Sequence, residues 1–169
     1  MQSLGTIQEA KAKVLADAKR CMERIRILSA TSFDTASQAV QVLQRIRSEA
    51  YEDLNQIQHE HLIACAAEWL VEHEDCPPET RWDWNPRQTG DHTEPDLVGR
   101  VGGVILVSAE ITTSARPDGV IDTRMRNTLA KLSQQDGRLH YFVQTAAMAT
   151  RAATKIRKAG WNIRVTQLA

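Results

Sequence analysis

Two adjacent prolines, Pro77 and Pro78, divide the chain into two parts with different hydrophobic patterns. Proline lacks a backbone donor and disfavours helical geometry at the residue before it, so a helix ends at or before this pair. Before the prolines, apolar residues recur at helical spacing; after them, strand-like and helix-like patterns alternate. This change predicts a helical N-terminal segment joined to a mixed α/β domain.

The N-terminal part has the pattern of two amphipathic helices. In the first, apolar side chains repeat every seven residues, at Ile7, Val14, Cys21 and Leu28. Residues 32–35 offer N-cap chemistry for the second helix, which is either one long helix or breaks near Gln58. Residues 1–57 are therefore predicted to form a helical hairpin, an element that most often packs or dimerises.

The second part, residues 58–169, is predicted to order its elements as helix, three strands, helix, strand, helix and strand. The strands are expected at 81–84, 97–101, 104–113, 139–143 and 161–168, and the later helices at 121–132 and 146–159. Gly102-Gly103, between the second and third strands, is a strong hairpin signal. The domain is thus expected to be α/β with an antiparallel start to its sheet.

Composition excludes several classes of protein. Hydrophobic residues make up 42% of the 169, enough for a buried core. No run approaches the roughly 18 apolar residues of a membrane span, and the first residues lack the apolar core of a signal peptide. The three cysteines lack zinc or disulfide spacing. We expect a soluble, cytoplasmic protein with no membrane association. The sequence contains no Gly-rich phosphate loop, so we expect no organic cofactor.

Charge is distributed unevenly along a chain that is neutral overall. Residues 1–75 carry 8 basic and 12 acidic side chains, and residues 76–115 carry 3 and 6. From residue 116 to the end there are 10 basic and 3 acidic side chains. An acidic segment followed by a basic one suits a metal site beside a surface for a polyanion. Chance unevenness of exposed charge is the alternative.

Two carboxylates flank the predicted hairpin: Asp96 in Glu94-Pro95-Asp96, and Glu110 fourteen residues later. A hard divalent cation needs carboxylate oxygens from converging segments, and opposite residues of a hairpin share a face. A three-residue loop at 102–104 places Asp96 directly across from Glu110. A two-residue turn places them on opposite faces of the sheet. A metal site therefore requires the longer loop or a bulge near Pro95.

Pro95-Asp96, the fourteen-residue gap and Glu110-x-Thr112 resemble the motif of the PD-(D/E)XK nucleases, the restriction-endonuclease-like superfamily. The resemblance covers residues 58–169, whose predicted element order matches that family's core. It implies a Mg²⁺-dependent phosphodiester hydrolase acting on DNA, with Mn²⁺ as a possible substitute. It also implies that Asp96, Glu110 and the backbone carbonyl of Ile111 bind the metal. A glutamate on the first core helix often completes the family's site: Glu60 is the preferred match, and Glu68 the second.

One position departs from the family pattern, because Thr112 stands where the family has a catalytic lysine. Arg124, Asn127 and Lys131 share one face of the following helix at spacing i, i+3, i+7. Lys131 is therefore the candidate for a relocated lysine, and Arg124 for a phosphate contact. A solvated face is the alternative. A second basic stripe, either phosphate-binding or simply solvated, consists of Arg151, Lys155 and Lys158.

These observations favour a restriction-type, metal-dependent DNA endonuclease. Its helical hairpin, residues 1–57, is expected to form a homodimer or to act as an arm that embraces DNA. The alternative is a catalytically silent nucleic-acid-binding or assembly subunit, which the missing lysine favours. Trp82 and Trp84 alternate along a strand and are expected to pack in the core. His59 and His61 cannot bind one metal from a helix at spacing i, i+2, and His92 is a possible base in the loop near the metal.

Overall fold

The computed structural model describes residues 1–74, 76–86 and 93–168. In this part of the chain the elements follow the order β1 (Gln2–Ser3), α1 (Ile7–Ser29), α2 (Ala36–His73), β2 (Arg81–Trp84), β3 (Leu97–Val101), β4 (Val104–Thr112), α3 (Val120–Leu132), β5 (Arg138–Val143), α4 (Ala146–Ala159) and β6 (Ile163–Gln167). The α/β class and the element order expected after the prolines are confirmed. Among these helices, none is long and apolar enough to cross a membrane.

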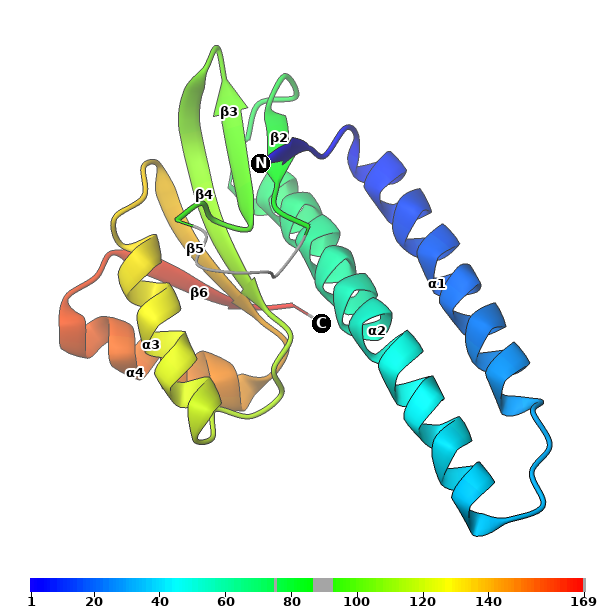
Figure 1. The fold of residues 1–169 in the computed structure, drawn as a ribbon. Helices are drawn as coiled ribbons and strands as arrows, with labels where there is room; N and C mark the ends of the chain where they lie inside the picture. The colour runs from blue at the N-terminus through cyan, green and yellow to red at the C-terminus, as the bar shows by residue number, and fades with distance from the viewer. Residues whose placement is uncertain (75, 87–92, 169) are drawn as a thin grey trace.

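The six strands form one mixed sheet in the order β1-β2-β3-β4-β5-β6 (Figure 1). β1 to β4 pair antiparallel, whereas β4, β5 and β6 pair in parallel. The antiparallel start expected from the hairpin signal is confirmed. The two-residue strand β1 was not predicted, because two residues are too few to show an alternating pattern.

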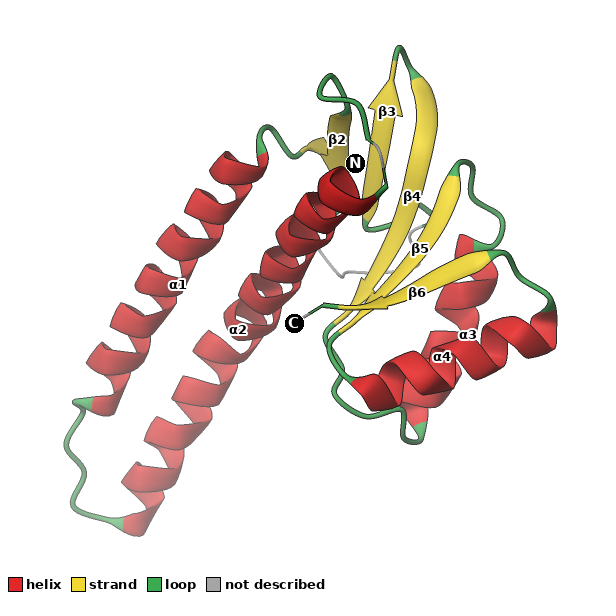
Figure 2. Cartoon of the chain, turned by 180° about the vertical axis from the view of Figure 1, so that it is seen from behind, coloured by secondary structure: helices red, strands yellow, loops and turns green. Residues whose placement is uncertain are grey.

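Helices cover both faces of the sheet (Figure 2). Buried side chains of α2 join the core on one face, together with Leu97, Ala109 and Phe142. Buried residues of α3 and α4 pack on the other face against Tyr141 and Val143 of β5. Successive residues of a strand point to opposite faces, which explains why neighbours such as Tyr141 and Phe142 enter different cores.

The two tryptophans of β2 lie in the core that α2 covers, as expected. Trp82 and Trp84 are both buried. Trp82 is paired with Gly99 of β3, and a Cβ added to that glycine would lie 2.8 Å from the Trp82 ring. Glycine at this position therefore leaves room for the indole.

Helix α2 is continuous over 38 residues, about 57 Å of helix. Thr35 caps its start, since the threonine side chain accepts a hydrogen bond from the Gln38 backbone N–H. The alternative of one long helix is confirmed, and the expected division at residue 57 lies within it. The N-terminal half of α2 runs beside α1, away from the sheet (Figures 1 and 2).

The β3–β4 hairpin contains a bulge. Val101 pairs with Val104 and Arg100 with Ile105, so Gly102-Gly103 forms a two-residue turn. The register then shifts, because Gly99 pairs with Val107 and leaves Leu106 as the extra residue of β4. Of the two turns considered, the two-residue turn is the one that forms, and the three-residue loop does not. The alternative of a bulge holds, but it lies at Leu106 rather than near Pro95.

Candidate functional site

The bulge determines how the two carboxylates meet. Beyond Leu106 the register pairs Leu97 with Ala109, and its continuation by one residue places Asp96 across from Glu110. Glu110 is only 5% exposed. Burial above all, and then the nearby charge of Asp96, raise the pKa of the Glu110 carboxyl to about 8, partly offset by Lys131. The two acids therefore form a close pair whose charges oppose each other.

Asp96 is held against β4 by a backbone hydrogen bond. Its Oδ2 accepts from the N–H of Ile111 at 2.8 Å. This contact orients the aspartate toward the strand that carries Glu110. Asp96 therefore lies against the segment of β4 that carries the other two expected ligands, Glu110 and the carbonyl of Ile111.

His59 of α2 also reaches Asp96, which was not predicted. Its Nε2 lies 3.4 Å from Oδ2 of Asp96. The side chain is 1% exposed, and neither ring nitrogen has a hydrogen-bond partner among the described residues. An unpaired buried polar group costs about 1–3 kcal/mol, and such groups often indicate an ion, a water or a catalytic role. One sequence signal was available: His59 lies four residues before Ile63, on the buried side of the helix.

Lys131 of α3 reaches the acid pair from the helix that follows the hairpin. Its Nζ forms an ion pair with Oε1 of Glu110 and donates to the carbonyl of Glu94 at 3.3 Å. Lys131, the candidate for a relocated lysine, therefore lies beside Glu110. Thr112 instead forms a side-chain hydrogen bond with Tyr141, a buried residue whose pKa is raised by burial. The positive charge beside the acids thus comes from Lys131 and not from position 112.

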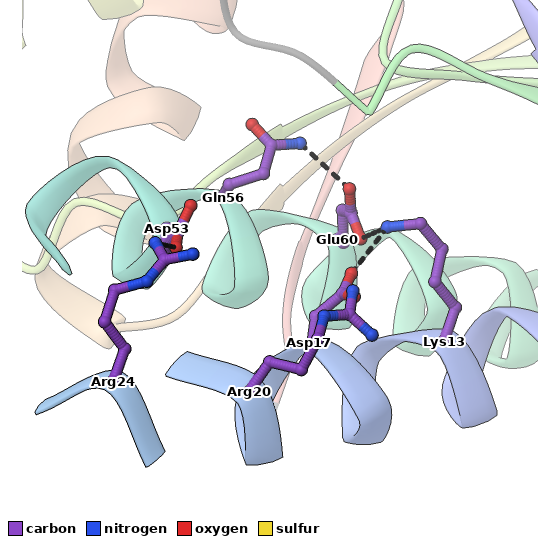
Figure 3. A network of polar contacts seen from close by, with 7 residues as sticks. All are labelled: Lys13, Asp17, Arg20, Arg24, Asp53, Gln56 and Glu60. Carbon is purple, nitrogen blue, oxygen red and sulfur yellow. Dashed lines mark hydrogen bonds and ion pairs between the residues drawn. The ribbon is translucent and has the colours of Figure 1, made fainter. Parts of the chain in front are cut away.

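The two glutamates considered for the first core helix both contact α1, and Figure 3 shows Glu60. Glu60 is buried and forms an ion pair with Lys13, and Gln56 donates to it at 3.0 Å. Glu68 forms an ion pair with Lys11 at 2.6 Å. Glu60 follows His59 by one residue, which turns it about 100° around the helix. The α2 residue that contacts Asp96 is therefore His59, one position before the glutamate expected there.

The expected nucleic-acid-binding residues divide into two groups. Arg124 and Asn127 of α3 and Lys158 of α4 are exposed. Arg151 donates to Asp122 through two hydrogen bonds of 2.7 and 2.9 Å, and Lys155 donates to the same carboxylate at 3.0 Å. These hydrogen bonds hold the pKa of Asp122 well below its usual range. Arg151 and Lys155 thus connect α4 to α3, while the first group faces solvent.

Asp96 and Glu110 carry oxygen ligands of the type that Mg²⁺ binds. No group of three His, Cys, Asp or Glu side chains in the described ranges is arranged to hold a metal. Mg²⁺, however, keeps several waters and is usually bound through one or two carboxylates. A cation between Asp96 and Glu110 would relieve the repulsion that raises the Glu110 pKa. His92, considered as a base, lies outside the described residues.

A comparison of the chain with protein-family models, with curated proteins and with solved structures finds no match in any of the three. What the site can do is therefore inferred from its own residues.

Proposed function

We propose that the α/β part of the chain is a divalent-metal-dependent phosphodiester hydrolase that acts on DNA. One observation carries the proposal: Asp96 binds the backbone of β4 beside the buried Glu110, and Lys131 of α3 forms an ion pair with Glu110. A bound Mg²⁺ or Mn²⁺ would polarise a phosphate and lower the pKa of an attacking water. The two carboxyls, of which Lys131 pairs with only Glu110, offer oxygen ligands for such an ion.

The residues of the site take separate roles in this proposal. Asp96 and Glu110 hold the ion, together with the carbonyl of Ile111. Lys131 stabilises negative charge that develops on the phosphate, because its ammonium lies beside Glu110. His59 of α2 orients the carboxylate of Asp96, which its imidazole contacts. Arg124 and Asn127, exposed on the helix of Lys131, contact the phosphate backbone.

Cleavage of plasmid DNA tests the proposal. With Mg²⁺ or Mn²⁺ the unaltered protein is expected to cleave, and Asp96→Asn and Glu110→Gln are each expected to abolish cleavage because each removes a metal-binding charge. Glu68→Gln is the matched control and is expected to cleave normally, since Glu68 pairs with Lys11. Cleavage that survives both site substitutions would rule out the proposed site.

Metal affinity tests the role of His59 separately. His59→Ala is expected to weaken Mn²⁺ binding by about 10–100-fold, the usual effect of removing a side chain that orients a ligand. His61→Ala, two residues away on the exposed side of the helix, is expected to bind as the unaltered protein does. Titration calorimetry measures both. Equal affinities for the two variants would exclude an orienting role for His59.

A silent nucleic-acid-binding subunit is the second candidate, and one observation favours it. Lys131 already supplies a positive charge to Glu110, so the acid pair is partly compensated without a metal. This candidate predicts salt-sensitive DNA binding, no heat of Mn²⁺ binding and no cleavage with either metal. The calorimetric titration therefore separates the two functions before any cleavage assay.

A further inference from the structure

The two-helix arm, defined as α1 with residues 36–57 of α2, has an unusually thin core. Ala50 is the one buried residue among 36–57, whereas the other buried residues of α2 run from His59 to Leu70. On α1 the buried residues are Ala10, Val14, Cys21 and Leu28. These residues form a seam between the two helices. Helices in proteins gain most of their stability from packing, and in the arm, which lies wholly within the described residues, only this single seam of buried residues provides it.

One side of this seam is polar and paired within the chain (Figure 3). Lys13 directly precedes the seam residue Val14 and forms ion pairs with Asp17 at 2.8 Å and with Glu60. Further along, Arg24 forms an ion pair with Asp53 at 2.7 Å and donates to the carbonyl of Glu49. Charges on this side are therefore used to hold the two helices together.

The other side of the seam is apolar and exposed. Leu15 and Met22 directly follow Val14 and Cys21 in the sequence, and Tyr51 directly follows Ala50. In an antiparallel hairpin, a two-fold axis perpendicular to the plane of the two helices exchanges one helix with the other. A residue that follows a seam residue by one position therefore lies on the same face of the hairpin in both helices. Helical spacing adds three residues of α2 to it. This apolar face consists of Leu15, Met22, Val40, Leu43, Tyr51 and Leu54, each between 49% and 65% exposed.

We propose that a second copy of this chain covers the apolar face, so that two arms pack into a four-helix bundle. Six half-exposed large side chains, at roughly 100 Å² each, supply about 600 Å², and their neighbours extend this toward the roughly 800 Å² per partner of a standard interface. A two-fold axis lets one face match itself. This inference does not depend on the proposed hydrolase.

Charge favours a second copy over a nucleic acid as the occupant. Residues 1–57 carry 8 basic and 7 acidic side chains, a near balance. Two such arms can approach without net repulsion, and a polyanion gains little from them. The basic excess of the chain lies instead in residues 116–169.

Molar mass in solution tests the interface. Sedimentation equilibrium from about 1 to 100 μM is expected to give twice 18.9 kDa for the unaltered chain. Leu43→Glu with Leu54→Glu is expected to give the monomer mass. Both residues are exposed, so the double variant is expected to keep its helix content by circular dichroism.

The matched control places the same charges on exposed valines outside the arm. Val104→Glu with Val120→Glu alters residues that are each 65% exposed, and this variant is expected to remain a dimer. A monomeric unaltered chain at every concentration overturns the proposal. So does a double variant at Leu43 and Leu54 that stays dimeric, or a mass larger than the dimer, which would indicate an open assembly.

Discussion

At the scale of single residues, the site depends on a carboxyl placed where strands rarely carry one. Glu110 lies between Ala109 and Ile111, both buried. Burial, and next the charge of Asp96, raise the pKa of its carboxyl to about 8, although the charge of Lys131 acts in the opposite direction. A group in this balance responds strongly to any added charge nearby, because water does little to screen it. The protonation of Glu110 therefore depends on whether a positive charge lies beside it.

His140 provides a test by pH that is independent of metal. Burial, and next the charge of Arg138, lower the pKa of His140 from 6.5 to about 4. The unfolded chain therefore binds a proton that the folded chain refuses between these values. The free energy of unfolding is therefore expected to keep its full value above pH 6.5, as far as His140 is concerned, and to fall as the pH drops toward 4. His140→Gln is expected to flatten this dependence, measured by urea unfolding at several pH values.

His61→Gln serves as the control for this measurement, because His61 is exposed. It is expected to keep the slope of the unaltered protein between pH 6.5 and 4. Identical slopes for His140→Gln and the unaltered protein would contradict the assignment. Glu74 lies 3.9 Å from His140, but Arg138 and Arg164 share its carboxylate.

The site residues differ in how far the sequence reveals them. Asp96 and Glu110 are found from their type and spacing, and Lys131 from its place on a helix face. His59 is not, because its partner Asp96 lies 37 residues away and no local spacing links the two. Glu60 is plausible from its place on the first core helix, but it lies one residue after His59 and therefore points to α1, where it pairs with Lys13.

At the scale of elements, periodicity predicts the helices and strands well but not the register between strands. The seam of α1 and the change of pattern at Pro77-Pro78 are both visible in the sequence. Residues 104–107 (Val-Ile-Leu-Val) are all apolar, so no alternation indicates which face each one takes. The bulge at Leu106 therefore could not be located from the sequence, although the meeting of the two acids depends on it.

The turn before β5 supports this bulge. Gly137 has a φ of +82°, and a Cβ there would lie 2.7 Å from the carbonyl carbon of Leu106. Gly137→Ala is expected to lose roughly 1–2 kcal/mol of unfolding free energy from backbone strain, and more from the displaced bulge. We also expect weaker Mn²⁺ binding, because the bulge places Asp96 across from Glu110. Urea unfolding and calorimetry measure the two effects.

Gly160→Ala separates strain from contact. Gly160 has a φ of +70°, and a Cβ there would meet no atom within 4 Å. This variant is expected to show the backbone loss alone and unchanged metal binding. Equal losses of stability for the two alanine variants would show that the bulge does not depend on Gly137.

At the scale of the whole molecule, charge and apolar surface are separated. The arm is nearly neutral and exposes an apolar face, whereas residues 116–169 carry the basic excess. Arg124 and Lys158 are exposed members of that excess. DNA is therefore expected to bind to the helical layer of α3 and α4, and not to the arm.

Charge reversal tests this separation. Arg124→Glu with Lys158→Glu is expected to weaken DNA binding and to reduce the dependence of log affinity on log salt by roughly 1–2, since each phosphate contact contributes about 0.9. Arg20→Glu with Arg45→Glu makes the same change of charge on exposed arm residues and is expected to bind normally. Fluorescence anisotropy across a salt series gives both slopes. A larger loss from the arm variant would place DNA on the arm.

The uninterrupted course of α2 has a mechanical consequence. One continuous helix carries Leu43 in the arm and His59 beside Asp96. Without a hinge between them, the arm cannot swing freely as a tethered appendage would. A movement of the arm would therefore also move the imidazole of His59, which contacts Asp96.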